Sequence, residues 1–391
     1  MVGLRIVSRI LPITAVLGFG LAMLLSADLA SAQTIDAQTA LCADENEAPE
    51  QRLSACNWLI DTAEGLSDER RASFYAHRGN AYSELQEYHL ATADYDRAIS
   101  SNPEDVIAIS NRATAHRYLG QHDLAIQDYD RAIRLDPHNP VHFFNRAGAH
   151  SEEGQYLEAI DDYTRTIELN PDLPPVHLDR ANAYVETEQY ARAIDDFTAV
   201  IRLAPDHADA YAGRANAYAN TRQFERAIKD FREAIRLEPD NDFIYVNLGS
   251  AFFEIGQYEE ALASIEEALT LDPDNVRAQG ALAWLYAAAK DPAYRKGDEA
   301  LRLAREAVLA RPSPEYLKTL AAAYVEIGDP ENALAAYEDA IMLGGSGVIS
   351  AYQAYLADKK IYAGPVNGIL DPATDAAIRA CIAAGCKLLA D

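Results

Sequence analysis

The sequence predicts an all-α solenoid of stacked helix–turn–helix units, because two residue types recur at one interval. Prolines stand at positions 103, 137, 171, 205, 239 and 273, each 34 residues after the last. Alanines keep the same interval at positions 91, 125, 159, 193, 227 and 261. A 34-residue period held over six units is typical of helical repeats that bury their apolar faces only against their neighbours. Such a stack presents a long concave surface, so we expect a binding protein and not an enzyme.

Within a unit, the spacing of small and aromatic residues predicts two amphipathic helices. In the first unit, Tyr75 and Gly79 lie four residues apart, and Ala91 and Tyr95 do the same farther along. Residues at this spacing share one face of a helix, so each helix has an apolar stripe for its partner. Pro103 then ends the second helix, because proline lacks the backbone N–H and its ring clashes with the preceding turn.

Two further units, starting near residues 276 and 314, depart from the regular interval. Ala300 takes the place of the recurring alanine but lies 39 residues after Ala261. The additional residues fall within 290–297, a stretch that contains proline and glycine. We expect them to lengthen the turn between the two helices of that unit.

The segment before the first unit has the pattern of a second helix without a first. Leu53, Cys56, Leu59 and Ile60 have helical spacing. We interpret residues 41–66 as a capping half-repeat, since the end units of a solenoid must cover a core that no neighbour covers.

This pattern of small, aromatic and proline positions resembles the tetratricopeptide repeat (TPR) family over residues 72–345. The resemblance implies a right-handed superhelical solenoid of about eight units, whose first helices line a concave groove that takes a protein or peptide. The units are expected to begin near residues 72, 106, 140, 174, 208, 242, 276 and 314, after an N-terminal linker and cap over 33–71.

Asparagines recur in the expected first helices at two positions one helical turn apart. They are Asn80, Asn111, Asn145, Asn182, Asn216 and Asn247. Because carboxamides both donate and accept, such a ladder is suited to hold an extended peptide backbone. The alternative is that these polar groups only stay hydrated. Glutamates at the far end of the same helices (Glu84, Glu152, Glu186 and Glu254) would favour a basic ligand.

A second polar pattern combines arginines with aspartates. Each of the first five units has an arginine in its first helix and an aspartate in its second: Arg78, Arg112, Arg146, Arg180 and Arg214, with Asp94, Asp128, Asp162, Asp196 and Asp230. The sixth unit has Leu248 and Ser264 at these positions. Joint presence and joint loss favour an Arg–carboxylate bridge. The alternative is a ladder of ligand-binding arginines, which would not predict the joint loss.

The N-terminus has the features of a secretory signal peptide over residues 1–32. Arg5 and Arg9 precede an uncharged run at 10–27, and small residues at 30–32 suit cleavage before Gln33. We therefore expect a bacterial periplasmic protein with no membrane span once the signal is removed. An uncleaved membrane anchor is the alternative.

Charge and motifs exclude several classes of function. The chain has 34 Lys and Arg against 61 Asp and Glu, a net charge of −27, which argues against nucleic acid as a partner. The nine histidines are scattered, without the spacing of a metal site, and there is no Gly-rich phosphate loop or nucleophile elbow. We expect no catalytic residue, cofactor or metal.

Four cysteines in an exported chain suggest two disulfides. Cys42 and Cys56 fall in the cap, and Cys381 and Cys386 near the end, so we expect local pairing. A continuous helix would hold the second pair too far apart, but Gly385 can end the helix between them. Free, buried thiols are the alternative.

The last segment, residues 346–391, departs from the repeat. It resembles the small helical peptidoglycan-binding domain at Gln353, Tyr362, Gly364, Pro365, Gly368 and Thr374. Asn367 and Asp371 stand where that family usually has aspartate and glycine. The resemblance implies a module that tethers the chain to the cell wall, and the alternative is a terminal cap for the solenoid.

Together these features favour a periplasmic scaffold that binds a protein or peptide in its groove. Two other roles stay open: a periplasmic chaperone or assembly factor, and a regulatory subunit of an envelope complex, neither with wall contact.

Overall fold

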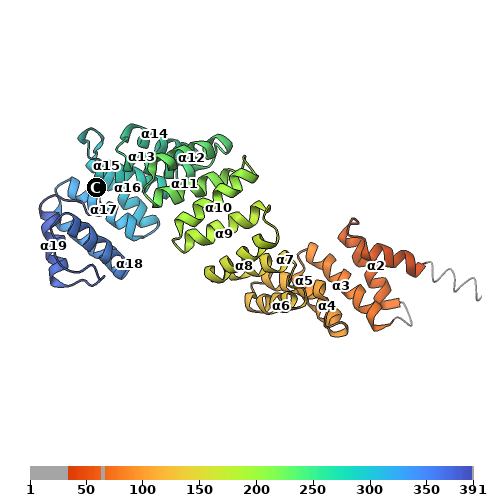
Figure 1. The fold of residues 1–391 in the computed structure, drawn as a ribbon. Coiled ribbons are helices and arrows are strands. Elements are labelled where there is room, and N and C mark those ends of the chain that lie inside the picture. The colour runs from red at the N-terminus through yellow and green to blue at the C-terminus, as the bar shows by residue number, and fades with distance from the viewer. Residues whose placement is uncertain (1–33, 63–66, 390–391) are drawn as a thin grey trace, which may run out of the picture. The chain divides into compact units, whose positions relative to one another are not determined.

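A computed structural model describes residues 34–62 and 67–389 of the chain (Figure 1). These residues are helical with no strand, which confirms the predicted all-α class. The expected signal peptide, residues 1–32, lies outside the described part. The chain divides into two compact units, the first ending at Asp172 and the second beginning at Leu173. None of the helices in the described residues is both long enough and apolar enough to cross a membrane.

The first compact unit is a series of antiparallel helix pairs. Consecutive helices pack on one another, α3 with α4, α5 with α6 and α7 with α8, and each pair contacts the next. The helices are α2 (Pro49–Thr62), α3 (Asp68–Glu84), α4 (Tyr88–Ser101), α5 (Val106–Tyr118), α6 (His122–Leu135), α7 (Pro140–Glu152) and α8 (Tyr156–Leu169).

The second compact unit continues the pairing and ends in a different arrangement. Its helices are α9 (Pro174–Glu186), α10 (Tyr190–Leu203), α11 (Ala208–Asn220), α12 (Phe224–Leu237), α13 (Asp242–Glu254), α14 (Tyr258–Leu271), α15 (Val276–Ala288), η1 (Pro292–Tyr294), α16 (Gly297–Ala310), α17 (Pro314–Glu326), α18 (Pro330–Asp358) and α19 (Pro372–Ala383). The first helices α13, α15 and α17 are neighbours, so they form one continuous face.

Small residues set the close approach of the helices within a pair. Ala91 and Ala98 of α4 are buried, as is the ring of Tyr95 between them. A Cβ at Gly79 would lie 2.8 Å from Cε1 of Tyr95, so glycine is needed where the aromatic ring crosses α3. Buried alanines and aromatics recur in the later pairs, which explains why the sequence period is so regular.

The turn between the two helices of a pair is equally repetitive. Except in the longer turn between α15 and α16, one residue in each takes a left-handed backbone conformation, as Gly120 does at φ 70° and Gly154 at φ 72°. Gln86, Glu188 and Arg222 adopt it without being glycine, at φ between 57° and 61°. Chain geometry, and not residue type alone, therefore sets this turn.

The cap differs from the expected half-repeat. Residues 34–43 are helical, although the part before residue 41 was expected as a linker, so α2 has a helical partner. Ile35 and Leu41 pack against a core that includes Cys42, Cys56 and Phe74, the last from α3. The cap is therefore a helix pair. Its additional helix forms because its apolar residues can pack against the core shared by α2 and α3.

Two departures from the period lie in the second compact unit. Residues 289–296 lengthen the turn between α15 and α16, as expected, and contain the short helix η1. At the predicted 345/346 boundary, α18 continues, with Gly345 leaving helical geometry at φ 60°. The segment after this kink packs with α19 and shares one apolar core with Ala321 and Tyr337 of the last regular pair.

Candidate functional site

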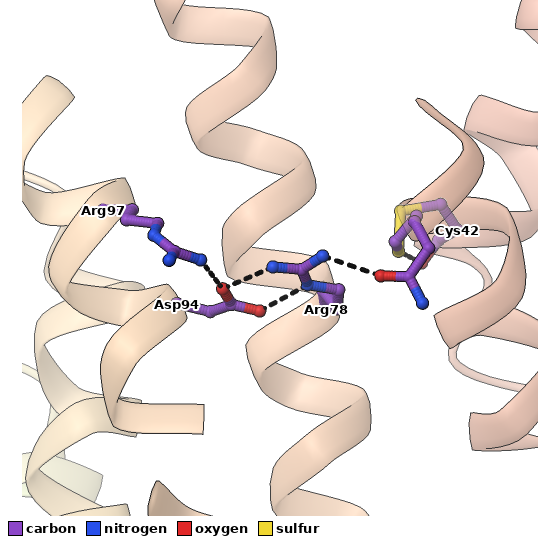
Figure 2. Close-up of polar contacts among 6 residues, drawn as sticks. Cys42, Arg78, Asp94 and Arg97 are labelled. Atoms are coloured by element: carbon purple, nitrogen blue, oxygen red, sulfur yellow. Dashed lines mark hydrogen bonds and ion pairs between the residues drawn. A yellow bond between two sulfur atoms is a disulfide. The ribbon is translucent and has the colours of Figure 1, made fainter. Parts of the chain in front are cut away.

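The arginine–aspartate pairs form in all five units that carry them. Arg78 donates from Nε and Nη2 to the two carboxylate oxygens of Asp94, at 2.6 and 2.8 Å (Figure 2). The other four pairs have the same two-bond geometry at 2.6–3.0 Å: Arg112–Asp128, Arg146–Asp162, Arg180–Asp196 and Arg214–Asp230. These bonds raise the pKa of Arg78, so it stays charged. The predicted bridge is confirmed.

Guanidinium groups of this ladder also reach beyond their own pair of helices. Nη1 of Arg112 binds Asp96 on the preceding α4 at 2.6 Å, and Nη1 of Arg214 binds Thr198 on α10 at 3.0 Å. The side chain of Arg78 contacts Asn57 of the cap in the same way, at 2.7 Å. One arginine thus joins three helices, so we interpret this ladder as structural and not as a ligand site.

The sixth unit replaces the pair with contacts that need no charge. Leu248 is buried on α13, and Ser264 on α14 donates to the backbone oxygen of Glu260 at 2.7 Å. Leu248 carries no charge, and the hydroxyl of Ser264 has a hydrogen-bond partner in its own helix, so neither residue leaves a buried charge unpaired. The joint loss seen in the sequence therefore has a direct packing explanation.

Four of the six predicted asparagines form two hydrogen-bonded pairs between neighbouring units. Asn111 donates from Nδ2 to Oδ1 of Asn80 at 2.9 Å, and Asn247 donates to Asn216 at 3.1 Å. Asn247 in turn accepts from Nη2 of Arg277 at 3.1 Å. The asparagine ladder is therefore partly engaged with itself and leaves only some of its donors and acceptors for a ligand.

The remaining two asparagines stand alone in their units. Asn145 lies half-buried on α7, at the position in its pair that Asn111 has, and Asn182 lies exposed on α9 at the position of Asn80. Asn145 belongs to the first compact unit and Asn182 to the second.

Two of the four recurring glutamates are bound by arginines of the protein itself. Glu152 accepts from Nε and Nη2 of Arg117 at 2.8–3.0 Å, and Glu84 binds the fully buried Arg52 at 2.6 Å. Half of the set predicted to favour a basic ligand is therefore paired within the protein.

A groove runs along the first helices of the second compact unit. One pocket, of about 490 Å³, is lined from α13, α15 and α17, and a second, of about 410 Å³, is lined from α11 and α13. Asn247 and Ser250 line both pockets, and Asn216 lines the second. Two of the predicted groove residues therefore border adjoining cavities.

Cations and aromatic rings line the larger pocket. Nζ of Lys318 lies 4.2 Å from the ring centroid of Trp284, and burial lowers its pKa. Arg277 stacks on Phe243 at 5.5 Å, and Arg311 also borders the cavity. One acidic residue, Glu315, also lines this pocket, but the three cations outnumber it, so this end of the groove is suited to acidic and aromatic groups.

Trp284 and Arg277 were missed because they are neither asparagine nor glutamate. Both nevertheless occupy repeat positions of the first helix: Trp284 stands 34 residues after Ser250, and Arg277 stands 34 residues after Phe243. Reading the groove positions by register instead of residue type would have found both.

Comparison with known families identifies the repeats. Sequence models of the tetratricopeptide repeat match residues 72–105, 106–139, 178–242 and 222–285. The chain contains tetratricopeptide repeats. The first two matches each cover one helix pair: the first covers α3–α4 except for the first four residues of α3, and the second begins with α5 at residue 106 and includes all of α5–α6. No curated protein sequence matches the chain significantly.

Solved structures with the same fold are distant in sequence. The C-terminal part of a TPR repeat-containing protein from Cytophaga hutchinsonii is 22% identical, with a TM-score of 0.53 over 63% of this chain and 99% of that one. YrrB, described as a TPR protein with an unusual peptide-binding site, is 21% identical over 47% and 95%, with a TM-score of 0.44. MamA from Desulfovibrio magneticus is 19% identical over 44% and 96%, at 0.42. The first of these likenesses supports the TPR fold.

Beyond the last TPR pair, the predicted peptidoglycan-binding motif forms an internal network around Gln353. This side chain is fully buried, and its Oε1 accepts from the backbone N–H groups of Asn367 and Gly368 at 2.9 and 3.0 Å. Its Nε2 donates to Oγ1 of Thr374 and to the backbone oxygen of Ile369, both at 3.0 Å. One amide thereby organises the loop between α18 and α19.

The other motif residues support the same loop. Tyr362 donates to the backbone oxygen of Pro365 at 3.1 Å, and Asp371 caps α19 by accepting from the N–H of Thr374 at 2.7 Å. Gly368 has φ 70°, and a Cβ at Gly364 would lie 2.4 Å from the Tyr362 hydroxyl oxygen. The motif thus builds the fold, and even the exposed Asn367 takes part in it, since its Oδ1 accepts from Nε2 of Gln353 at 3.2 Å; Pro365 is also exposed.

The structure pairs the cysteines locally. Cys42–Cys56 and Cys381–Cys386 are disulfides, each with Cα atoms 5.0 Å apart. Helix α19 ends at Ala383, and Gly385 at φ 76° turns the chain back so that the second pair can meet. Among the described residues, no three His, Cys, Asp or Glu side chains are grouped as metal ligands would be.

Proposed function

We propose that this chain is a protein-interaction scaffold that binds an extended peptide or protein segment along its TPR groove. The observation that carries the proposal is the pair of adjoining pockets over α11, α13, α15 and α17. They share Asn247, which borders both cavities and accepts a hydrogen bond from Arg277. A ligand that follows the groove would therefore meet carboxamides, cations and rings in succession.

Such a ligand needs several weak contacts acting together. A single hydrogen bond contributes only about 0.5–1.5 kcal/mol net. Trp284 and Phe243 add apolar and aromatic surface, which contributes most of the binding energy at many interfaces. The cations of the larger pocket favour acidic groups on the part of the ligand that lies over α15 and α17.

A pull-down with the mature chain tests this proposal. We expect Asn247→Ala combined with Arg277→Ala, which removes both partners of one hydrogen bond in the larger pocket, to lose the bound partner while the helical signal and melting temperature stay nearly unchanged. Gln127→Ala, which removes an exposed carboxamide on the second helix α6, is the matched control and should retain the partner. Retention of the partner by the double variant would place the binding site elsewhere.

We further propose a periplasmic location, with tethering to peptidoglycan by residues 346–391. The location rests on the signal-peptide pattern at residues 1–32, and tethering rests on the motif around Gln353. A chaperone or assembly factor, or a regulatory subunit of an envelope complex, is the alternative without wall contact. All three roles use the same groove.

Sedimentation of the intact chain with purified sacculi separates tethering from the alternatives. Deleting the segment is unsuitable, because Tyr352 and Leu356 share a core with Tyr337 of α18. The exposed loop residues Pro365 and Val366 can instead be changed together to alanine, which leaves the bond between Asn367 and Gln353 in place. We expect the wild type to sediment and this variant to stay in solution; a wild type that stays in solution would favour the alternatives.

A further inference from the structure

The two departures from the repeat face each other across one pocket. The lengthened turn between α15 and α16 supplies Lys290 and Arg295 to its lining. The segment after Gly345 supplies Tyr355, Lys359 and Lys387 from the opposite side. The cavity measures about 420 Å³, within the range of roughly 300–1,000 Å³ that small-molecule sites occupy.

This pocket has the opposite charge to the rest of the chain. Among the described residues that line it, four are Lys or Arg and none is acidic. Glu326, which is not among the lining residues, forms ion pairs with Lys387 and, at 3.4 Å, with Nη1 of Arg295. In a chain of net charge −27, four cations that line one pocket, of which two share a single carboxylate, form a local region of positive potential.

Backbone and covalent contacts hold both walls in place. On one side, the backbone N–H of Lys290 donates to the hydroxyl of Tyr258 at 3.1 Å, and that of Lys296 to the backbone oxygen of Tyr286 at 3.0 Å. On the other side, the hydroxyl of Tyr355 donates to the backbone oxygen of Lys387 at 3.1 Å, next to the Cys381–Cys386 disulfide. The cations therefore project from anchored segments.

One donor in the pocket wall has unused capacity. Nε of Arg295 is buried and makes no hydrogen bond to any described residue. A buried donor without a partner is uncommon in native proteins, and a guanidinium binds oxyanions through two parallel N–H groups. An anion entering the pocket would meet Arg295 as well as the more exposed lysines.

We propose that this pocket binds a small, multiply charged oxyanion, a molecule with two or more carboxylate or phosphate groups. Two lysines at the rim, Lys290 and Lys359, attract the ligand, and the half-buried Arg295 and Lys387 contact it deeper in the cavity. The lengthened turn and the C-terminal segment are both needed, because each contributes two of the four cations. The site is separate from the TPR groove and does not depend on its function.

Calorimetric titration of the full mature chain tests this site with two probes, inorganic pyrophosphate and citrate. The test variant is Lys290→Gln with Lys359→Gln, and the control is Arg134→Gln with Lys229→Gln, which removes the same charge from exposed positions on α6 and α12. We expect the wild type and control to bind with similar affinity and the test variant to lose about tenfold or more. Binding should weaken as salt rises.

The two probes distinguish the sources of the anionic groups. Binding of both supports a general oxyanion site, and binding of pyrophosphate or citrate alone narrows the ligand to phosphates or carboxylates. If neither probe binds, or if the test variant and the control weaken equally, the pocket is not an anion site. Circular dichroism of each variant confirms that the exposed substitutions leave the fold unchanged.

Discussion

Arg146 on α7 donates from Nε and Nη2 to both carboxylate oxygens of Asp162 on α8, at 2.7 and 2.6 Å, and its Nη1 binds Asp130 on α6. The Asp162 side chain is only 8% exposed, whereas that of Asp130 is 40% exposed. The bridge to Asp162 is therefore the costly one to break, because a buried carboxylate would lose its compensating charge.

We predict that Arg146→Leu lowers the free energy of unfolding by about 1–3 kcal/mol, since it leaves Asp162 buried and unpaired. The double change Arg146→Leu with Asp162→Ser copies the solution of the sixth unit and should recover much of this loss. Urea unfolding followed by circular dichroism measures both.

The control is Arg165→Leu, which breaks the exposed pair with Glu168 at 2.7 Å. Exposed pairs contribute about 0–1 kcal/mol, so this change should have a small effect. A double variant that is no more stable than Arg146→Leu alone would show that the two residues do not act as a pair.

A second prediction concerns Gln353, the centre of the C-terminal network. Gln353→Leu keeps the approximate volume but leaves the backbone N–H groups of Asn367 and Gly368 without their acceptor. Each unsatisfied buried group costs about 1–3 kcal/mol, so we expect a clear fall in melting temperature. Gln127→Leu, at an exposed position on α6, should change it little. Equal melting of the two variants would contradict the structural role given to the motif.

A third prediction is a pH dependence from His142 on α7. Burial lowers the pKa of this imidazole, although Asp136 acts in the opposite direction. Its Nδ1 lies 3.1 Å from Oγ of Ser110, and its Nε2 is buried without a partner among the described residues. The folded state thus favours neutral His142, so its stabilising contribution is complete above the unfolded pKa of about 6.5 and is lost as pH falls below that value.

The comparison that isolates this residue is the change in melting temperature between about pH 7.5 and 5.5. We expect His142→Leu to lose less stability over this range than the wild type does. His138→Leu removes an exposed histidine and should behave like the wild type. If His142→Leu follows the wild-type curve, His142 is not buried in its neutral form.

A fourth prediction concerns the Cys42–Cys56 disulfide of the cap. It closes a loop of 14 residues, and loop-closure entropy gives it a stabilising contribution of about 3 kcal/mol. Changing both cysteines to serine should loosen the cap and uncover Phe74, which limited proteolysis followed by mass spectrometry would detect as early cleavage before α3. The Cys381–Cys386 disulfide lies in the C-terminal segment, so its double serine variant should leave cleavage before α3 unchanged. Early cleavage in both variants would argue against a local role for the cap disulfide.

The helix pairs could be predicted from sequence because their contacts are local and repeated. Seven first helices begin at the expected residues 106, 140, 174, 208, 242, 276 and 314. The bridge between Arg146 and Asp162 was also predictable, because the sixth unit loses both partners together. Because the same contact recurs in several units, the residues that form it appear several times at one interval, and such a recurrence rarely arises by chance.

Features that occur once in the chain had no such support. Nothing in the sequence indicated that residues 34–43 are helical, or that Gln353 is fully buried inside the C-terminal segment. Nor did it show that Lys290 and Lys387, 97 residues apart, border one pocket. A linear period constrains neighbours within and between units, whereas the meeting of the lengthened turn with the C-terminal segment depends on how α15 to α19 pack in three dimensions.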